Sequence, residues 1–162
     1  MNFSTILQAE RVANTEKRDV PKSIAEAIRL HSLWLDGNPL GACASMRNKN
    51  LRDCLLEGVR LQGVEAERCS FVGAIMKGAW LTAGDFDFAD FQACDLRRAY
   101  LIDASLYRAN LRFADLSGAR LRGADLTGAD LRDVNFQNAD LRNVNFTDAI
   151  MRGMIVDSRT SF

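Results

Sequence analysis

Apolar residues recur at every fifth position through most of this sequence. Counted in fives from Leu116, all 23 successive positions from Met46 to Val156 are apolar, with no insertion. At an apolar content of 48%, chance gives such a series roughly once in 10⁷ trials. A period of five suits neither an α-helix, with 3.6 residues per turn, nor a β-strand, whose side chains alternate with a period of two. The series therefore predicts a backbone that changes direction every five residues.

Two other positions of the five-residue unit are also restricted in composition. The residue two places before each apolar centre is small and most often alanine, as at Ala114 and Ala119. The residue two places after the centre is often glycine or asparagine, as at Gly118 and Asn138. Both residue types tolerate the positive φ that a type II turn needs at its third position. We therefore expect a turn after each centre, with the centre and its small partner both facing inward.

Four corners of about 90° close one coil in about 20 residues, and neighbouring coils stack about 4.8 Å apart through backbone hydrogen bonds. A single coil cannot bury its apolar centres, whereas a stack of coils can. One wall of such a stack carries only leucine centres: Leu61, Leu81, Leu101, Leu121 and Leu141. The sequence thus predicts an all-β solenoid with four walls.

The units "ANLRF", "ADLSG", "ADLTG" and "ADLRN" resemble those of the pentapeptide-repeat family, including its many cyanobacterial members. The resemblance extends over about residues 44–157. It implies a right-handed quadrilateral β-helix of about five to six coils at residues 43–157, followed by a C-terminal tail at residues 158–162. The apolar end "GMIVDSRTSF" either caps the rod or pairs two molecules, as in some relatives, so a homodimer through an end of the rod is one expectation.

Residues 1–42 lack the five-residue period and are expected to form an α-helical cap. Ser4 is a candidate N-cap for a first helix that ends at about Glu16. Ser23 and Glu26 form an S-x-x-E capping box for a second helix.

The second helix is predicted to be amphipathic. Its apolar face carries the following residues: Ile24, Ala27, Ile28, His31, Trp34 and Leu35. An open end of a β-solenoid exposes unpaired backbone and core side chains. We therefore expect His31, Trp34 and Leu35 to cover the first coil.

Charge and hydropathy exclude several partners. Lys plus Arg and Asp plus Glu both number 21, so the zero balance gives no long-range field that attracts nucleic acid or an anionic membrane. No apolar run reaches the roughly 18 residues of a membrane-spanning helix. Residues 1–10 lack the basic start and apolar core of a signal peptide. A cytoplasmic location is the expectation that follows.

The sequence offers little for catalysis or cofactor binding. Cys43, Cys54, Cys69 and Cys94 form no CxxC pair and match no zinc-site spacing. Cys54 and Cys94 share a wall two coils apart, about 9.6 Å at the strand spacing, which is beyond disulfide reach. The only histidine, His31, has no nucleophile placed for a catalytic triad and is expected to be packed. We predict no enzyme activity, no metal site and no cofactor.

Two charged groups leave alternatives open. Four aspartates crowd one coil: Asp85, Asp87, Asp90 and Asp95. They indicate a solvated acidic turn, with a weak cation site as the alternative. Three arginines stack on another wall: Arg112, Arg132 and Arg152. With aspartates on the same wall, they indicate a solvated surface, and the alternative is contact with phosphate or an acidic protein.

The best candidate surface is a strip of outward aromatic and arginine residues on the all-leucine wall, which we call the aromatic strip. Its members flank the leucine centres: Arg60, Trp80, Tyr100, Ile102, Arg120 and Arg122. Aromatic residues and arginine are enriched in binding hot spots, so the strip is a candidate site for a protein partner. The alternative is self-stacking for stability alone, with Trp80 over Tyr100 and arginines against the rings.

The predicted function is a non-catalytic structural or protein-interaction module. The alternative that the resemblance suggests is gyrase protection, because some pentapeptide-repeat proteins mimic B-DNA in shape and charge. Such mimicry needs a strongly acidic surface. Residues 44–157 contain 15 Lys plus Arg and 16 Asp plus Glu, so this requirement is not met.

Overall fold

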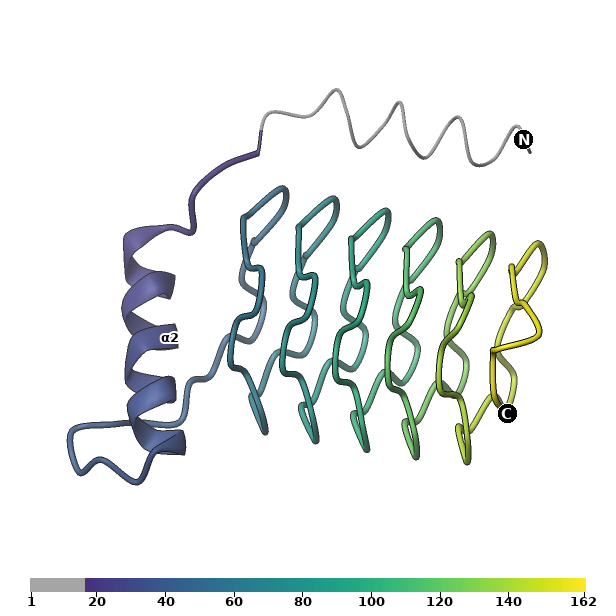
Figure 1. Cartoon of the computed structure of the whole chain (residues 1–162). Coiled ribbons are helices and arrows are strands. Elements are labelled where there is room, and N and C mark those ends of the chain that lie inside the picture. Colours follow the sequence, from purple (N-terminus) through teal and green to yellow (C-terminus); the bar gives the residue numbers. More distant parts are fainter. Residues whose placement is uncertain (1–16) are drawn as a thin grey trace.

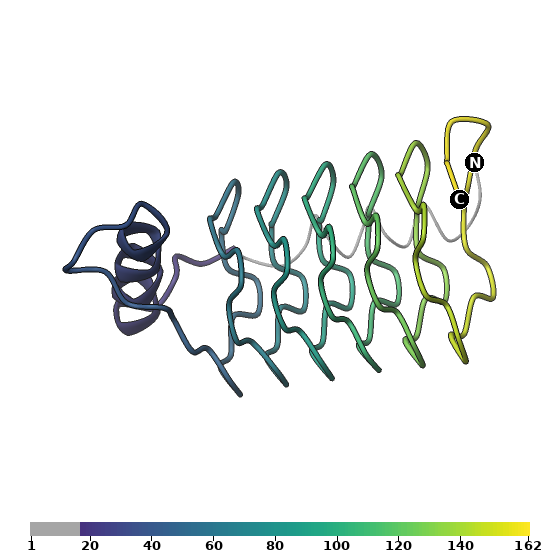
Figure 2. The same cartoon turned by 90° about the horizontal axis from the view of Figure 1, so that it is seen from below.

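The computed structural model describes residues 17–162, and the helix expected from Ser4 to about Glu16 lies outside the described residues. Helix α2 (Lys22–Leu35) comes first and is followed by a stack of coils that reaches the C-terminus. Figures 1 and 2 show the stack from two sides, with α2 standing across its N-terminal end. No helix among residues 17–162 is long and apolar enough to cross a membrane.

Each wall of the stack is a ladder of isolated parallel β-bridges rather than a set of extended strands. The ladders begin at Ser45, Asn50, Leu55 and Arg60, by which we name them, and nearly every bridge joins residues that are 20 apart. Because the ladders follow one another in this order around a coil, the Asn50 and Arg60 ladders lie on opposite walls. The predicted four-walled solenoid with a 20-residue coil is therefore confirmed.

Both ends of the stack depart from the regular bridging. At the N-terminal end, Arg18 pairs with Cys54, so a residue preceding α2 extends the Leu55 ladder. At the C-terminal end, Asp140 pairs with Ser161, one residue later than the period requires. The segment expected as a C-terminal tail thus contributes a bridge to the Arg60 ladder.

The corners have the geometry that the glycine and asparagine pattern predicts. At each of them, from Asn48 to Gly153, the third residue has φ between 54° and 76°. The fourth residue donates its N–H to the carbonyl of the first, as from Ala119 to Leu116 over 3.0 Å. Fourteen of these corner residues are not glycine, among them Ala83. The stacked backbone therefore imposes a left-handed conformation that most residue types avoid.

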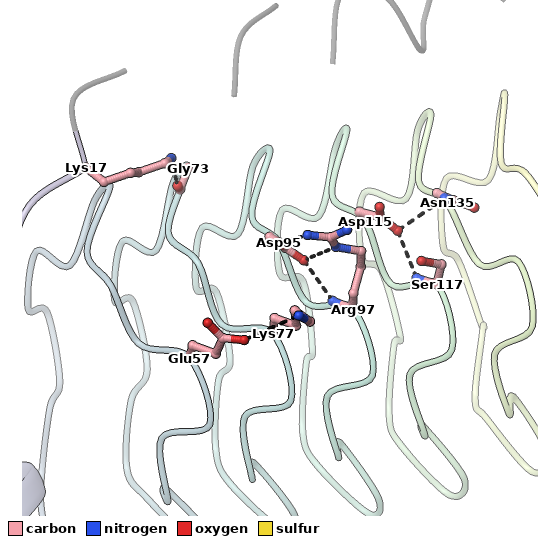
Figure 3. Close-up of polar contacts among 9 residues, drawn as sticks. All are labelled: Lys17, Glu57, Gly73, Lys77, Asp95, Arg97, Asp115, Ser117 and Asn135. Atoms are coloured by element: carbon pink, nitrogen blue, oxygen red, sulfur yellow. Dashed lines mark hydrogen bonds and ion pairs between the residues drawn. The ribbon is translucent and has the colours of Figure 1, made fainter. Parts of the chain in front are cut away.

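Ladder residues also shape the corners through their side chains. Asp95 Oδ1 accepts the backbone N–H of Arg97 at 3.2 Å, and Asp115 Oδ1 accepts that of Ser117 at 2.9 Å (Figure 3). Asp115 also accepts a bond from the Asn135 side chain one coil further on, over 3.1 Å. Aspartate and asparagine are common before the apolar centre because their side-chain oxygen closes such a turn.

The apolar centres fill the interior of the coils. Every centre from Met46 to Leu141 is at most 4% exposed. The last three centres are not fully buried, since Phe146 is partly buried and Met151 and Val156 remain 44% and 43% exposed. The last three centres are thus less buried than those within the stack, as expected where a coil is packed on one side only.

Helix α2 begins differently from the prediction. Its N-cap is Pro21, one residue before the helix, and no side chain forms a capping hydrogen bond. The expected capping box of Ser23 and Glu26 is therefore absent. The Glu26 carboxylate instead pairs with Arg29 over 2.7 Å on the exposed side of the helix.

Candidate functional site

The structure brings four members of the aromatic strip into one ladder. Arg60, Trp80, Tyr100 and Arg120 follow one another in parallel bridges. The rings of Trp80 and Tyr100 stack with centroids 4.5 Å apart and planes 19° from parallel. The Arg120 guanidinium carbon lies 5.0 Å from the Tyr100 ring centroid. Trp80 still has 44% of its surface exposed, so stacking does not cover it.

Arg60 has a different partner from the one that self-stacking predicts. Its Nη1 and Nη2 donate to the carboxylate of Asp36 over 3.2 and 2.9 Å. Asp36 is the residue that follows α2. The hydrogen bonds lower the pKa of Asp36 and raise the pKa of Arg60. Arg60 thus connects the helix to the wall, and the strip residues without a contact to the helix begin at Trp80.

The other two strip residues lie on an adjoining corner. Ile102 and Arg122 each follow a leucine centre of the all-leucine wall, where the chain turns toward the Ser45 ladder. Ile102 is half-buried and Arg122 is exposed. The strip therefore combines a flat aromatic stack with an apolar and a cationic side chain at its edge.

A second group of aromatic and arginine residues was not predicted. Phe88 and Tyr107 meet edge to face with centroids 5.5 Å apart. The guanidinium carbon of Arg68 lies 5.5 Å from the Phe88 centroid, and that of Arg108 lies 5.3 Å from the Tyr107 centroid. Phe88 has φ of 58°, at a corner where the sequence pattern favours glycine. In the sequence, the only feature that could have indicated this group is Phe88 at a corner position where glycine or asparagine is usual.

His31 joins α2 to the first coils. Its ring is fully buried, and Nδ1 accepts the N–H of Ala44 at 3.1 Å. Nε2 therefore carries the proton and donates to the Gln62 carbonyl at 3.0 Å. Burial is the main cause that lowers the pKa of His31, so the neutral ring is favoured. Both ring nitrogens are used in packing the helix against the coils.

The other two expected cap residues are less covered than His31. Trp34 stacks on the His31 ring, with centroids 5.4 Å apart and planes 30° from parallel. It nevertheless remains 44% exposed, and Leu35 is half-buried. The helix thus contacts the coils chiefly through Ile24 and His31, the two buried residues of α2.

The cysteines and the aspartate cluster lack the arrangement of a reactive or metal site. Cys54, Cys69 and Cys94 are buried free thiols, and Cys43 is an exposed one. Burial raises the pKa of Cys69 to about 11 and that of Cys94 well above its ordinary value. Asp90 and Asp95 lie on ladders different from that of Asp85. Within residues 17–162, no three acidic, histidine or cysteine side chains gather as metal ligands.

Together these observations define a repeat protein of the four-walled β-solenoid class, whose outward side chains are displayed on flat walls. The family model described as pentapeptide repeats matches with 8 copies over residues 50–87, 85–123 and 114–153. These segments make up more than half of the sequence. The chain therefore belongs to the pentapeptide-repeat family.

Several solved structures resemble this chain. HetL, a pentapeptide-repeat protein involved in heterocyst differentiation regulation in Nostoc sp. strain PCC 7120, is 27% identical with a TM-score of 0.52. The match covers 70% of this chain but only 58% of HetL. Rfr23 from Cyanothece 51142 is 25% identical with a TM-score of 0.43, over 65% of each chain. QnrB1, a plasmid-mediated fluoroquinolone resistance protein, is 22% identical with a TM-score of 0.48, over 73% of this chain and 67% of its own. No curated protein matches the sequence.

Proposed function

We propose that this protein is a non-catalytic interaction module that receives a protein partner on the aromatic strip. The observation that carries the proposal is Trp80, which is 44% exposed although it stacks on Tyr100. An exposed tryptophan on a flat, rigid wall offers a large apolar area whose ordering on binding costs little conformational entropy. Arg122, two coils further along the rod at the adjoining corner, supplies a charge that selects among partners.

The stack also contributes to stability, and this contribution alone does not account for the strip. Ring pairs of this kind stabilise a protein by about 0.5–1.5 kcal/mol beyond the area they bury. That contribution comes from the inner faces of Trp80 and Tyr100 and needs neither Ile102 nor Arg122. A partner that lies along the wall and covers the exposed part of Trp80 contacts all four residues.

The likeness to HetL supports a regulatory role exerted through binding. HetL is involved in the regulation of differentiation, and the stacked coils of this chain resemble its fold. The balance of acidic and basic residues favours this role over DNA mimicry, because residues 44–157 carry nearly equal charges of both signs. We infer that the module works in the cytoplasm, in line with the expectation from the sequence.

The two ends of the rod have different roles in this proposal. Helix α2 caps the N-terminal end of what we take to be a right-handed β-helix. The C-terminal end exposes four large apolar side chains: Ile150, Met151, Val156 and Phe162. We propose that a second copy of the chain covers this end, because apolar side chains and an unpaired coil edge favour stacking of two identical ends.

The test is a capture experiment from the native host with the purified protein, a Trp80→Ala/Tyr100→Ala variant and a matched control. Phe88→Ala/Tyr107→Ala removes the other aromatic pair and serves as that control. Melting curves establish that all three proteins are folded. We expect the strip variant to lose a partner that the wild type and the control both retain, with crosslinks to the strip in the wild type. Identical partners for all three proteins would show that the strip serves stability alone.

A further inference from the structure

Three turns of the solenoid neutralise an arginine within the turn itself. The aspartates are Asp95, Asp130 and Asp140, and each is followed two residues later by an arginine that folds back on it. In each pair the arginine Nε donates to Oδ1 at 2.8 Å, and Nη2 donates to Oδ2 at 2.5–2.7 Å. Figure 3 shows this arrangement for Asp95 and Arg97. A ladder aspartate therefore binds the arginine that follows it with both carboxylate oxygens and compensates its charge.

Arg112 and Arg152 follow ladder residues that carry no charge. Asn110 precedes Arg112, and Ile150 precedes Arg152. Asn110 uses its oxygen for the backbone N–H of Arg112 at 3.2 Å and its amide group for Asp90 at 2.9 Å. It therefore offers nothing to the Arg112 guanidinium. On the Asn50 ladder, Arg112 and Arg152 thus lack the carboxylate that Asp130 supplies to Arg132 between them.

The consequence for Arg112 is an unsatisfied donor. Its Nε is buried and forms no hydrogen bond with any atom of residues 17–162. Arg112 Nε lies 4.0 Å from Oδ2 of Asp130, which is too far for a hydrogen bond. The Asp130 carboxylate already accepts two hydrogen bonds from Arg132. The Arg112 guanidinium is kept in place over the Phe113 ring, 5.2 Å from its centroid. A buried N–H in a fixed position requires an acceptor.

The unsatisfied arginines share one hollow on the surface. Its volume is about 310 Å³, and five residues line it: Arg112, Arg132, Asp133, Arg152 and Gly153. We call it the arginine hollow. The three arginines occupy the same position in consecutive coils, so their guanidinium groups lie close together along the stack. Arg152 is exposed, and within residues 17–162 no carboxylate lies near enough to form an ion pair with it.

The negative groups around the hollow do not cancel its charge. Asp130 binds Arg132 with both oxygens. Asp133 lies against Gly153, where an added Cβ would collide with Asp133 Oδ1. The hollow and its rim therefore contain three guanidinium groups and two carboxylates, and the Asp130 carboxylate is paired with Arg132. The hollow therefore retains a net positive charge, and the exposed Arg152 guanidinium is one of the groups that line it.

We propose that the arginine hollow binds an oxyanion of the phosphate class, as the free ion or as the terminal monoester of a larger ligand. The exposed part of the Arg112 guanidinium, whose side chain is 35% exposed, and the Arg152 guanidinium donate to it, while Asp130 holds Arg132 in position between them. Arginine suits this role because its planar fork matches the oxygens of phosphate and stays charged at all physiological pH values. Asp133 opposes the second charge of a dianion and limits affinity.

This site is independent of the aromatic strip. The arginine hollow lies where the Asn50 ladder turns toward the Leu55 ladder, whereas the strip follows the Arg60 ladder on the opposite wall. A partner seated on Trp80 leaves the hollow accessible. We therefore expect Trp80→Ala/Tyr100→Ala to bind phosphate as the wild type does, which separates a failure of one proposal from a failure of the other.

The test is a titration with inorganic phosphate at constant ionic strength, with chloride as the balancing ion. Arginine Nε–H signals in ¹⁵N NMR report the site directly. We expect the Arg112 and Arg152 signals to move in a saturable manner with a millimolar dissociation constant, while the Arg97 signal stays in place. Chemical-shift changes of the Arg112 and Arg152 signals that rise linearly with phosphate concentration, or that are equal in phosphate and in chloride, would refute the site.

Variants that restore the missing carboxylates make the test specific. Asn110→Asp and Ile150→Asp recreate the sequence of the self-neutralised turns, and each should weaken phosphate binding by tenfold or more. Asp133→Asn should tighten binding several-fold. Arg97→Gln removes an arginine already paired with Asp95 and should have no effect. Ile150 is 49% exposed, so Ile150→Asp remains informative even where Asn110→Asp disturbs its bond to Asp90.

A second ligand distinguishes the free ion from a larger molecule. A short phosphoserine peptide and its unphosphorylated form are titrated beside inorganic phosphate. Equal affinity for phosphate and phosphopeptide assigns the hollow to the ion, and tighter binding of the phosphopeptide assigns it to the monoester end of a larger ligand. Wild-type affinity in Ile150→Asp and Asn110→Asp, or no binding of either phosphate form, would overturn the proposal.

Discussion

Gly84 is the position at which the packing of this solenoid is most sensitive to a single methyl group. It occupies the small position of its unit, which alanine takes in most other units. A Cβ built on Gly84 would lie 2.5 Å from Cε2 of Phe86 and 3.1 Å from the Leu81 carbonyl oxygen. The Phe86 ring is fully buried, and it packs edge to face against Phe71 and Phe91 at 6.2 and 5.6 Å. It therefore has no free space into which to move.

The expected cost of Gly84→Ala follows from this crowding. Overpacking a core typically destabilises a protein by about 1–3 kcal/mol. Replacing glycine with alanine also lowers the conformational entropy of the unfolded chain, which stabilises the folded protein by about 0.4–1 kcal/mol. The net loss is then about 1–2 kcal/mol. For a chain of this size 1 kcal/mol corresponds to about 2–4 °C, so the midpoint of thermal unfolding should fall by about 2–8 °C.

A double-mutant cycle followed by circular dichroism and calorimetry checks the cause. Phe86→Leu shortens the obstructing side chain, so Gly84→Ala should cost at least about 1 kcal/mol less in the Phe86→Leu background than alone. Gly78→Ala is the matched control, because its φ is 65° and its Cβ would have no atom within 4 Å. It is expected to show backbone strain without coupling to Phe86. Additive effects of Gly84→Ala and Phe86→Leu, or a stable Gly84→Ala protein, would refute the reasoning.

Three other predictions follow from the core, the helix and the C-terminal end. Leu121→Ala should destabilise by about 2–5 kcal/mol, whereas Val156→Ala, at a centre 43% exposed, should change stability by less than about 0.5 kcal/mol; chemical denaturation compares them, and equal effects would contradict the burial of the core. Burial lowers the folded-state pKa of His31 from 6.5, so the contribution of the neutral ring to folding stability is complete above pH 6.5 and is lost as the pH falls below it. Hydrogen exchange should show α2 opening more at pH 5 than at pH 7.5, and His31→Gln should abolish that difference. Met151→Asp/Val156→Asp should convert the proposed dimer to a monomer in sedimentation equilibrium, with Arg97→Gln as a control that leaves the wild-type mass unchanged.

The interior of the solenoid could be predicted from the sequence because its rule is strict and local. A centre such as Leu101 must be large and apolar in every unit, and a partner such as Ala99 must be small. Coil stacking then fixes which residues become neighbours, since residues 20 apart pair across coils. The stacking of Trp80 on Tyr100 follows from this register without any knowledge of side-chain conformation.

The corner geometry was predicted, but the non-glycine residues that adopt it and the contacts at the ends were not. Phe88 adopts φ of 58° because backbone hydrogen bonds to neighbouring coils hold its corner, so stacking overrides the preference for glycine. The pairing of Arg60 with Asp36 depends on where α2 lies, and the five-residue period does not encode that placement. The burial of His31 was predicted from helix periodicity, but its bonds to Ala44 and Gln62 were not.

Comparing each outward residue with its equivalents in other turns shows which charged side chains lack a partner within their own turn. An arginine that follows Asp95 or Asp140 is neutralised where it stands, so it has little capacity left for a partner. Arg112 and Arg152 lack that aspartate, and so does Arg122, whose ladder residue is Arg120. The same criterion therefore selects two arginines of the hollow and one of the aromatic strip, on opposite sides of the rod. We therefore propose that binding surfaces in such a solenoid arise where a turn leaves its own charge uncompensated, because the repeating interior leaves only the outward positions free to vary.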